Sequence, residues 1–190
     1  MRYSAAHKAE TRQHLLKVTG ALAKKNGFSA SGVDALMAAA GLTSGAFYNH
    51  FSSKTELFSE LVSEELKHTA SMFSDTTTDQ PVDEWIELQL RRYLTWKHAQ
   101  SAESGCVIPS LGPEIARADK ATKKKYEDGL KHIRDIWADK LGDEKTAWAV
   151  CAQLVGAILL ARAMASEKTG KEVLDASKAF LMKTLSQPGS

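Results

Sequence analysis

The sequence predicts an all-α protein, and three observations carry that prediction. Apolar residues recur every three or four positions along several long segments, the spacing that lines one face of a helix. Glycines and short polar clusters separate these segments, as helix ends require. Hydrophobic residues make up 43% of the 190 residues, enough for a sizeable core. We expect about nine helices: an N-terminal three-helix head with a helix-turn-helix, a connecting helix and a helical-bundle body.

The first expected helix runs from His7–Asn26. Leu15 and Ala23 fall on one of its faces. Gly27 ends it, because glycine readily takes the left-handed conformation that follows many helices. We expect residues 1–7 to form a disordered arm.

A short helix and a tight turn follow, over residues 33–40 and Gly41. Ser31, with Asp34 three residues later, approximates a capping box and marks the start of this helix. Gly41 stops it, and Thr43 is placed to cap the next helix. Two short helices joined by a glycine-containing turn make a helix-turn-helix.

The second helix of this pair combines two anchors with a polar surface. Phe47 and Phe51 lie four residues apart, so both point from one face into a core. The other residues are small or hydrogen-bonding, and none is acidic: Ser44, Gly45, Ala46, Tyr48, Asn49 and His50. Asn49 can pair with one adenine edge, and Tyr48 and His50 can reach phosphates. The alternative is a polar-faced helix that only packs through its two phenylalanines.

The connecting helix is predicted to begin at Ser53 and to run to about Phe73. Ser53 and Glu56 have the spacing of a capping box. Lys54 then lies in the first turn, where the helix dipole favours an anion over a cation. A lysine at this position makes more sense beside a phosphate than beside water.

Several of these residues form one dense pattern, which is Ala40-Gly41-Leu42, Gly45-Ala46, Phe47-Tyr48-Asn49-His50-Phe51, Lys54 and Leu57. With them, residues 27–62 closely resemble the DNA-binding domain of TetR-family transcriptional regulators. The resemblance implies a DNA-binding domain over residues 1–52 and an effector-binding and dimerisation domain over residues 53–190. The sequence departs from the family at Asp34 and Ser44, where many members carry Lys or Arg.

The resemblance also implies a function. We expect a homodimeric repressor that leaves a palindromic operator when a small hydrophobic or electrophilic effector binds. Ser31, Thr43 and Lys54 would contact DNA together with the polar surface of the second helix. The alternatives are a helical enzyme and a protein-interaction module that does not bind DNA. We expect no enzyme, because the sequence offers no nucleophile elbow, Gly-rich phosphate loop or paired carboxylates at metal spacing.

The charge distribution and the cysteine content limit which partners, metal sites and cellular compartment fit this sequence. Residues 1–55 hold seven Lys or Arg against two acidic residues, a formal charge of +5, whereas the rest of the chain carries −3. A basic N-terminal part fits a nucleic-acid-binding head, although ordinary solvated lysines would give the same count. The two cysteines form no disulfide framework or zinc site, so we expect no metal and no cofactor. With no signal-peptide pattern and no membrane-length apolar run, we expect a cytoplasmic protein that does not bind membranes.

The body is predicted to contain five further segments, at Val82–Ala99, Cys106–Ala116, Lys120–Leu141, Glu144–Ser166 and Lys171–Leu185, with a turn at residues 168–170 before the last. Its large apolar residues are candidates for lining an effector pocket, each with an alternative as a core residue. The candidates are Trp85, Tyr93, Trp96, Cys106, Ile108, Leu111, Trp137, Trp148 and Met164.

The last two helices are apolar on more than one side, so something must cover a second face. In TetR-like proteins the corresponding helices form a dimeric four-helix bundle. The candidates for this interface are Val155, Leu159, Val173, Phe180 and Leu181. The alternative is a purely intramolecular core.

Cys106 follows Gly105 at the expected start of a helix, where the pKa of a thiol falls and its nucleophilicity rises. The pair resembles a Gly-Cys pair in TetR-like repressors that sense electrophiles. The alternative is a small packing residue. Cys151 lies in an apolar run and is expected to be inert.

Overall fold

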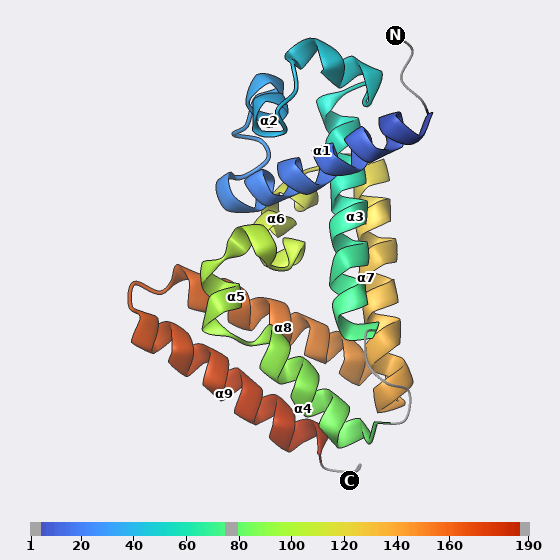
Figure 1. Cartoon of the computed structure of the whole chain (residues 1–190). Helices are drawn as coiled ribbons and strands as arrows, with labels where there is room; N and C mark the ends of the chain where they lie inside the picture. The colour runs from blue at the N-terminus through green and yellow to red at the C-terminus, as the bar shows by residue number, and fades with distance from the viewer. Residues whose placement is uncertain (1–4, 75–79, 187–190) are drawn as a thin grey trace. The chain divides into compact units, whose positions relative to one another are not determined.

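The computed structural model describes residues 5–74 and 80–186, and within these ranges all of the regular structure is helical (Figure 1). The all-α prediction is confirmed. The elements are α1 (Ala5–Asn26), α2 (Val33–Ala39), η1 (Ser44–Asn49), α3 (Lys54–Ser74), α4 (Val82–Tyr93), α5 (Trp96–Gln100), η2 (Ala102–Ser104), α6 (Val107–Ala116), α7 (Lys120–Leu141), α8 (Glu144–Ala163) and α9 (Glu167–Leu185). The η elements are 3₁₀ helices.

The chain forms two compact units, and each is discontinuous in sequence. The first unit comprises Met1–Lys67 and Ala102–Glu127, and the second comprises His68–Ser101 and Asp128–Ser190. α6 therefore belongs with the N-terminal helices, while α3 and α7 each contribute to both units. The functional domains predicted at 1–52 and 53–190 follow a different division and stay a prediction.

In the first unit, α1 packs against α2, α6 and η2. Leu15 and Ala23 of α1 are fully buried, as their spacing predicts, and so are Leu36 and Met37 of α2. α1 begins at Ala5, so the arm expected over residues 1–7 is wrong for residues 5–7, which are helical. Residues 1–4 lie outside the described part of the chain.

Two glycine turns in the first unit are as predicted. Gly27 ends α1 with φ of 84°, and Gly41 follows α2 with φ of 71°. The predicted cap of α2 is wrong, because Gly32 takes the N-cap position and no side chain caps that end. Ser31 is buried, and its hydroxyl donates backward to the Gly27 carbonyl at 3.3 Å.

The second unit contains two helix boundaries that differ from the prediction. The helix expected over residues 82–99 is interrupted, because Thr95 takes an extended conformation and its side chain accepts a hydrogen bond from the His98 amide at 3.1 Å to cap α5. The turn expected at residues 168–170 is the first turn of α9. Ser166 caps α9, and Gly170 lies against the Trp96 ring with no room for a side chain.

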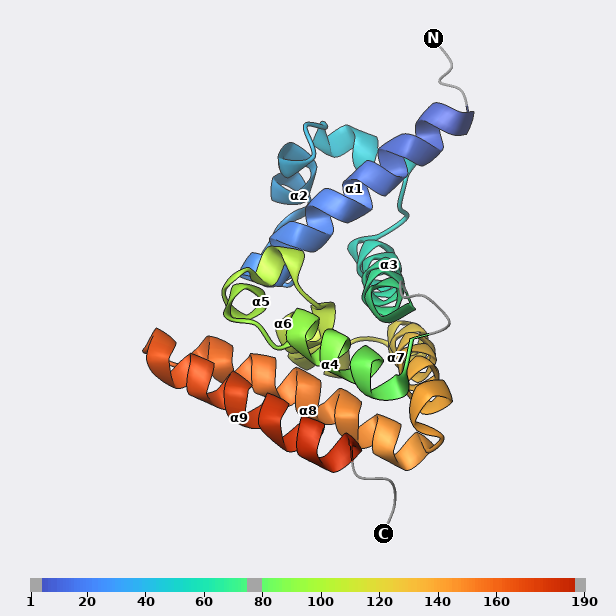
Figure 2. The same ribbon diagram turned by 60° about the horizontal axis from the view of Figure 1, so that its bottom comes forward.

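α8 and α9 run side by side as a hairpin of helices in the second unit, and α9 also packs on α4 and α5 (Figure 2). α8 is long and apolar enough to cross a membrane by length and composition, with 39% of its most apolar window buried. A core helix of a folded domain passes the same test. Phe73, Trp85, Tyr93 and Trp137 form an aromatic cluster with successive ring centroids 4.8–5.7 Å apart.

Candidate nucleic-acid interface

The segment expected to be the second helix of the helix-turn-helix is a 3₁₀ helix, η1, instead of an α-helix. The Ala46 amide donates to the Thr43 carbonyl at 3.0 Å, and the His50 amide donates to the Phe47 carbonyl at 2.9 Å. Both bonds span three residues, which winds the backbone more tightly than an α-helix. Thr43 stands at the N-cap as predicted, but its side chain makes no capping bond.

The two predicted anchors hold η1 to the core of the first unit. Phe47 and Phe51 are 0% and 1% exposed, and their ring centroids lie 5.9 Å apart. The Arg12 guanidinium of α1 lies 4.6 Å from the centroid of the Phe51 ring. Tyr48, between the anchors, is 73% exposed. The segment therefore separates an apolar side from a polar side, as the i, i+4 spacing predicts.

The polar side of η1, with its two cap residues, brings seven of the nine predicted DNA-contacting residues onto one short surface, and only Ser31 and Lys54 lie outside it. Ala46 and His50 are half-buried, and the others are exposed: Thr43, Ser44, Gly45, Tyr48 and Asn49. A Cβ added at Gly45 would meet open space. The small residues leave the backbone accessible, which is what close approach to base edges requires.

A hollow of about 410 Å³ adjoins this surface. Its lining comes from the start of α1 and from η1 and its turn: His7, Lys8, Thr11, Leu42, Ala46, Asn49 and His50. Burial, then the nearby charges of Lys8 and Arg12, lower the pKa of His50 below its usual 6.5, so the ring is neutral at pH 7. Sequence reasoning did not single out Lys8 or Thr11, because only the fold brings α1 to η1.

The start of α3 confirms half of the predicted capping box. The Glu56 amide donates to the Ser53 hydroxyl at 3.0 Å, but the Glu56 carboxylate accepts from Ser52, from its amide at 2.7 Å and its hydroxyl at 2.5 Å. Lys54 is half-buried: its Nζ donates to the Ser29 carbonyl at 3.3 Å and lies 4.9 Å from the Phe28 ring centroid. A phosphate contact by Lys54 stays a prediction.

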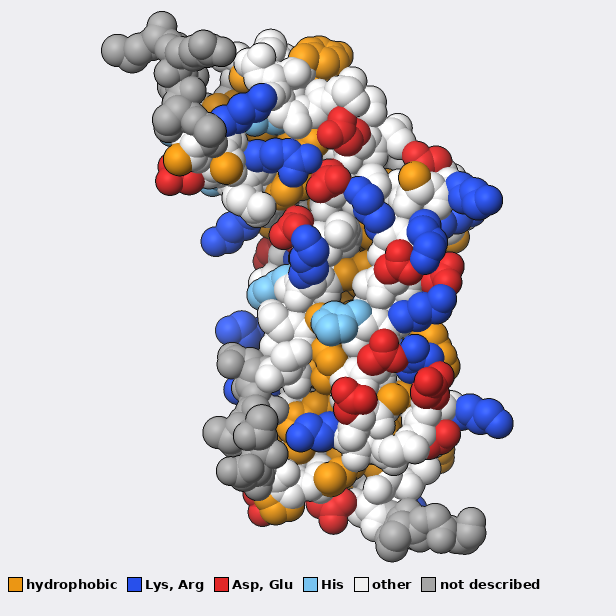
Figure 3. Space-filling view, turned by 90° about the vertical axis from the view of Figure 1, so that its right-hand side faces the viewer, with side chains coloured by type: hydrophobic (Ala, Val, Ile, Leu, Met, Phe, Trp, Pro, Cys, Tyr) orange, Lys and Arg blue, Asp and Glu red, His pale blue; other side chains and the backbone are white. Residues whose placement is uncertain are grey.

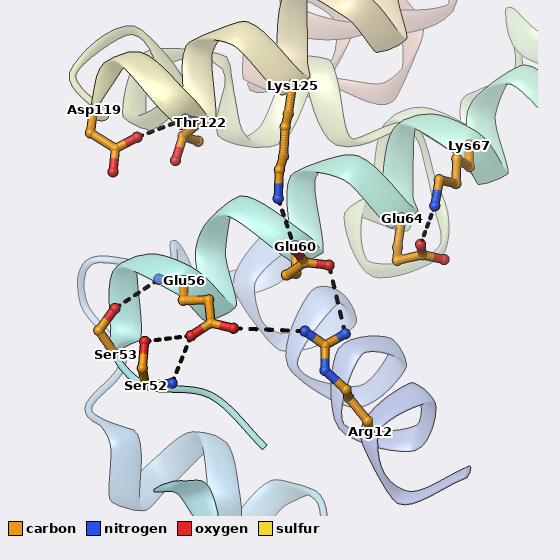
Figure 4. A network of polar contacts seen from close by, with 10 residues as sticks. All are labelled: Arg12, Ser52, Ser53, Glu56, Glu60, Glu64, Lys67, Asp119, Thr122 and Lys125. Atoms are coloured by element: carbon orange, nitrogen blue, oxygen red, sulfur yellow. Dashed lines mark hydrogen bonds and ion pairs between the residues drawn. The ribbon is translucent and has the colours of Figure 1, made fainter. Parts of the chain in front are cut away.

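Ion pairs link α1, α3 and α7 at the surface of the first unit (Figure 4). Arg12 of α1 lies 3.6 Å from Glu60 and 3.9 Å from Glu56, and Lys125 of α7 bonds Glu60 at 2.8 Å. The hydrogen bond from Lys125 is the main cause that lowers the pKa of Glu60. Figure 3 shows acidic and basic side chains interspersed on the face that it draws, as such pairing requires.

A second set of polar contacts joins α1 to α3 and to the segment that precedes α6, and sequence reasoning missed it. Lys24 is 7% exposed, and its Nζ donates to Glu65 of α3 at 2.7 Å and to the Gly105 carbonyl at 3.0 Å. A side chain at Gly20 would collide with Glu65. Gly20, a glycine inside α1, was the available signal, because a helix position without a side chain leaves room for a neighbouring one.

Glu114 of α6 completes this attachment. Its carboxylate accepts from the Phe28 amide at 2.9 Å, the Ser29 amide at 2.7 Å and the Ser29 hydroxyl at 2.5 Å. Burial opposes ionisation of Glu114, but the hydrogen bonds from Ser29 and Phe28 outweigh it and lower the pKa of the carboxyl. α6 runs through Pro113, although a proline inside a helix commonly kinks or breaks it, and so carries Glu114 in its last turn.

The candidates for an effector pocket are not gathered in one place. Trp85 and Trp137 are 0% exposed within the aromatic cluster, and three others lie buried at or near the start of α6 in the first unit: Cys106, Ile108 and Leu111. Trp148 and Met164 are half-buried. Tyr93 and Trp96 line two separate pockets of the second unit.

The candidates for dimerisation divide by exposure. Leu159 and Phe180 are 48% and 60% exposed, whereas Leu181 is only 3% exposed and packs inside its own chain. Two are half-buried, Val155 and Val173. Sequence reasoning missed Leu160, which is 54% exposed. Across residues 5–74 and 80–186, no group of three or more His, Cys, Asp or Glu could hold a metal ion.

Comparisons with known proteins agree with the resemblance. Residues 15–61 match the model of the family described as bacterial regulatory proteins, tetR family. Over 52 residues the chain is 46% identical to the HTH-type transcriptional regulator AcrR of Shigella flexneri, a match covering 27% of this chain and 24% of AcrR. The chain thus matches about a quarter of that relative's length.

Solved structures extend the likeness to the whole fold. E. coli NemR in its reduced form superposes with a TM-score of 0.80 at 18% identity, over 95% of this chain and 100% of NemR. A TetR transcriptional regulator from Legionella pneumophila gives 0.77 at 19% identity, over 97% of this chain and 100% of that one. At such identities the likeness concerns the fold.

Proposed function

We propose that the chain is a TetR-family regulatory protein and a sequence-specific repressor of transcription, which the family match of residues 15–61, the identity to AcrR over 52 residues and the likeness of its fold support. It binds operator DNA in the cytoplasm and leaves that DNA when a small molecule binds. The observation that carries the proposal is the short exposed surface of η1, which the buried rings of Phe47 and Phe51 anchor to the core.

Each part of that surface has its own role in the proposal. Ser44 and Asn49 read base edges, while Gly45 and Ala46 allow close approach. Phosphates are held by Thr43, Tyr48 and His50. Ser31 and Lys54 join this interface only by giving up the bonds that they make to Gly27 and Ser29 in the free chain.

The proposed repressor is a homodimer. Leu159, Leu160 and Phe180 expose apolar surface on α8 and α9, and a second copy would cover it. Two heads related by a two-fold axis then require a palindromic operator with half-sites about one helical turn apart or more.

Release requires an effector that binds the DNA-incompetent state better than the competent one. An electrophile acting at Cys106 would meet this condition through the neighbouring contacts. Cys106 is 1% exposed, and the Lys24 ammonium holds the carbonyl of Gly105 beside it. A group added to the thiol would displace this segment from α1.

Footprinting on the DNA that flanks the protein's own gene tests the proposal. We expect a protected palindrome, weaker binding by Tyr48→Phe with an unchanged circular dichroism spectrum, and altered sequence preference in Asn49→Ala and Ser44→Ala. A helical enzyme or a protein-interaction module would leave duplex DNA unprotected.

The electrophile part has its own test. A quinone should modify Cys106 before Cys151 and release the DNA, and Cys106→Ser should bind DNA normally without that response. Release with Cys106 unmodified, or modification with DNA still bound, would return Cys106 to a packing role.

A further inference from the structure

α4 presents three chemically different side chains on one face. Gln89, Arg92 and Tyr93 stand at positions i, i+3 and i+4, which places them together on the helix surface. With Met72 and Phe73 of α3 they line a hollow of about 310 Å³, and all five belong to the second compact unit. This volume lies at the small end of the range of about 300–1,000 Å³ that is typical of ligand sites.

Gln89 is the unusual member of this lining. Its side chain is 1% exposed, and its Nε2 is buried without a hydrogen-bond partner in the part of the chain that the structure describes. A buried amide donor without an acceptor costs about 1–3 kcal/mol. A leucine or methionine would fill this position without that cost, so the amide at this point is suited to an acceptor carried by a bound molecule.

The rest of the lining indicates what carries the acceptor. Phe73 and Tyr93 form an aromatic wall, with ring centroids 5.7 Å apart, and the Trp137 ring supports Phe73 from 5.5 Å. Arg92 is exposed and lines the same hollow. The walls are therefore apolar, with a hydrogen-bond donor at a buried position and a cation at an accessible one.

We propose that this hollow is the site of a compact carboxylate with an apolar body, such as an aromatic monocarboxylate. One carboxylate oxygen accepts from the Gln89 amide, the charge is balanced by Arg92, and the apolar body lies against Met72, Phe73 and Tyr93. That this ligand is the effector of the repressor rests on the proposed function, whereas its binding does not.

Calorimetry on the full chain with three probes of one size separates the contributions. Benzoate carries an acceptor and a charge, benzamide carries an acceptor without the charge, and toluene carries neither. We expect benzoate to bind most tightly and toluene most weakly. Gln89→Met keeps the length of the side chain without its amide, and it should weaken benzoate and benzamide about tenfold or more while sparing toluene.

Arg92→Gln should weaken benzoate alone and remove the salt dependence of its binding. Arg91→Gln, a neighbouring exposed arginine outside this hollow, is the matched control and should change nothing. The site is overturned if benzoate does not bind, or if it binds Gln89→Met and wild type equally.

A gel-shift assay with operator DNA then separates the two proposals. Gln89-dependent binding of benzoate without release of DNA supports the site and removes its role as effector site. Operator binding by a protein that ignores benzoate overturns the site and leaves the repressor.

Discussion

The first compact unit holds α1 by two sets of ion pairs that share their chemistry and differ in their surroundings. The side chains of Lys24 and Glu65 are only 4% and 12% exposed. Arg12, Glu60 and Lys125 form pairs at the surface, with side chains 30%, 30% and 39% exposed. Water screens the surface pairs, so each of them contributes between zero and about 1 kcal/mol to the free energy of unfolding.

The buried set behaves differently when one partner is lost. An ammonium in the interior stabilises its carboxylate against desolvation, so removing it leaves an uncompensated buried charge. Lys24 also satisfies the Gly105 carbonyl, which places one side chain of α1 in contact with both α3 and the segment that enters α6. The comparison indicates that Lys24 and Glu114 tie the α6 region to α1 and to the segment after α1, whereas the surface pairs link α1 to α3 and α3 to α7.

The largest expected effect follows from breaking the buried pair. Lys24→Met should lower the free energy of unfolding by about 3–5 kcal/mol, because Glu65 stays buried without its partner. Urea unfolding followed by circular dichroism measures this. The double variant Lys24→Met/Glu65→Leu is the control and should recover most of the loss. A single-variant cost below about 1 kcal/mol would place Lys24 with the surface pairs.

A charge at Phe180 tests a surface that its own chain leaves open. Phe180→Asp should leave the fold of the single chain intact, since this side chain is 60% exposed. It should dissociate the dimer and abolish operator binding, because a buried unpaired charge at the interface costs several kcal/mol. Phe180→Tyr keeps the ring and should remain dimeric. Wild type that sediments as a monomer at micromolar concentration would contradict the assignment.

Local patterns in the sequence predicted the elements whose causes are local. Gly27 and Gly41 end helices because of their own backbone freedom, and Phe47 and Phe51 are buried because their spacing puts them on one face. The interruption at Thr95 was missed although its cap is local, since the Thr95 side chain accepts from the His98 amide three residues later. The other end of α5 has a contact that no local pattern contains, because the Arg162 Nε donates to the Ala99 carbonyl at 3.0 Å from 63 residues away.

Local sequence patterns were limited in the same way for the candidate sites, because they do not contain contacts between distant residues. The polar surface of η1 could be predicted, because its members are neighbours in sequence. Lys24 meets Glu65 and Gly105 across 41 and 81 residues, and no local pattern contains such pairs. Gln89 was missed for a related reason, since its significance lies in a buried amide donor that has no hydrogen-bond partner among the residues that the structure describes.

Removing the charge of Lys54 should have a smaller effect, and that effect is on DNA binding. Lys54→Ala should weaken operator binding with the fold intact and reduce the slope of log affinity against log salt by about 1, because one phosphate contact is lost. Fluorescence anisotropy over a salt series measures both. Lys25→Ala, an exposed lysine in the last turn of α1, should leave the slope unchanged. An unchanged slope and affinity in Lys54→Ala would remove Lys54 from the contacts.

The smallest expected effect concerns the surface pair of Glu60 and Lys125, and it depends on pH. The hydrogen bond from Lys125 lowers the pKa of Glu60 below its usual 4.5 in the folded chain, so folding favours the ionised carboxylate. The stabilisation is therefore fully present above pH 4.5 and is lost as the pH falls through the lowered folded-state pKa. Lys125→Gln should cost at most about 1 kcal/mol at pH 7.

That cost should vanish well below pH 4.5, where Glu60 is protonated in both variant and wild type. Lys123→Gln, an exposed change in the same helix, should show no such pH dependence. Chemical unfolding of the three proteins at several pH values measures the difference. A cost for Lys125→Gln that persists unchanged in acid would mean that Lys125 stabilises α7 by packing its methylene chain, because protonating Glu60 removes the charge pair but leaves that contact in place.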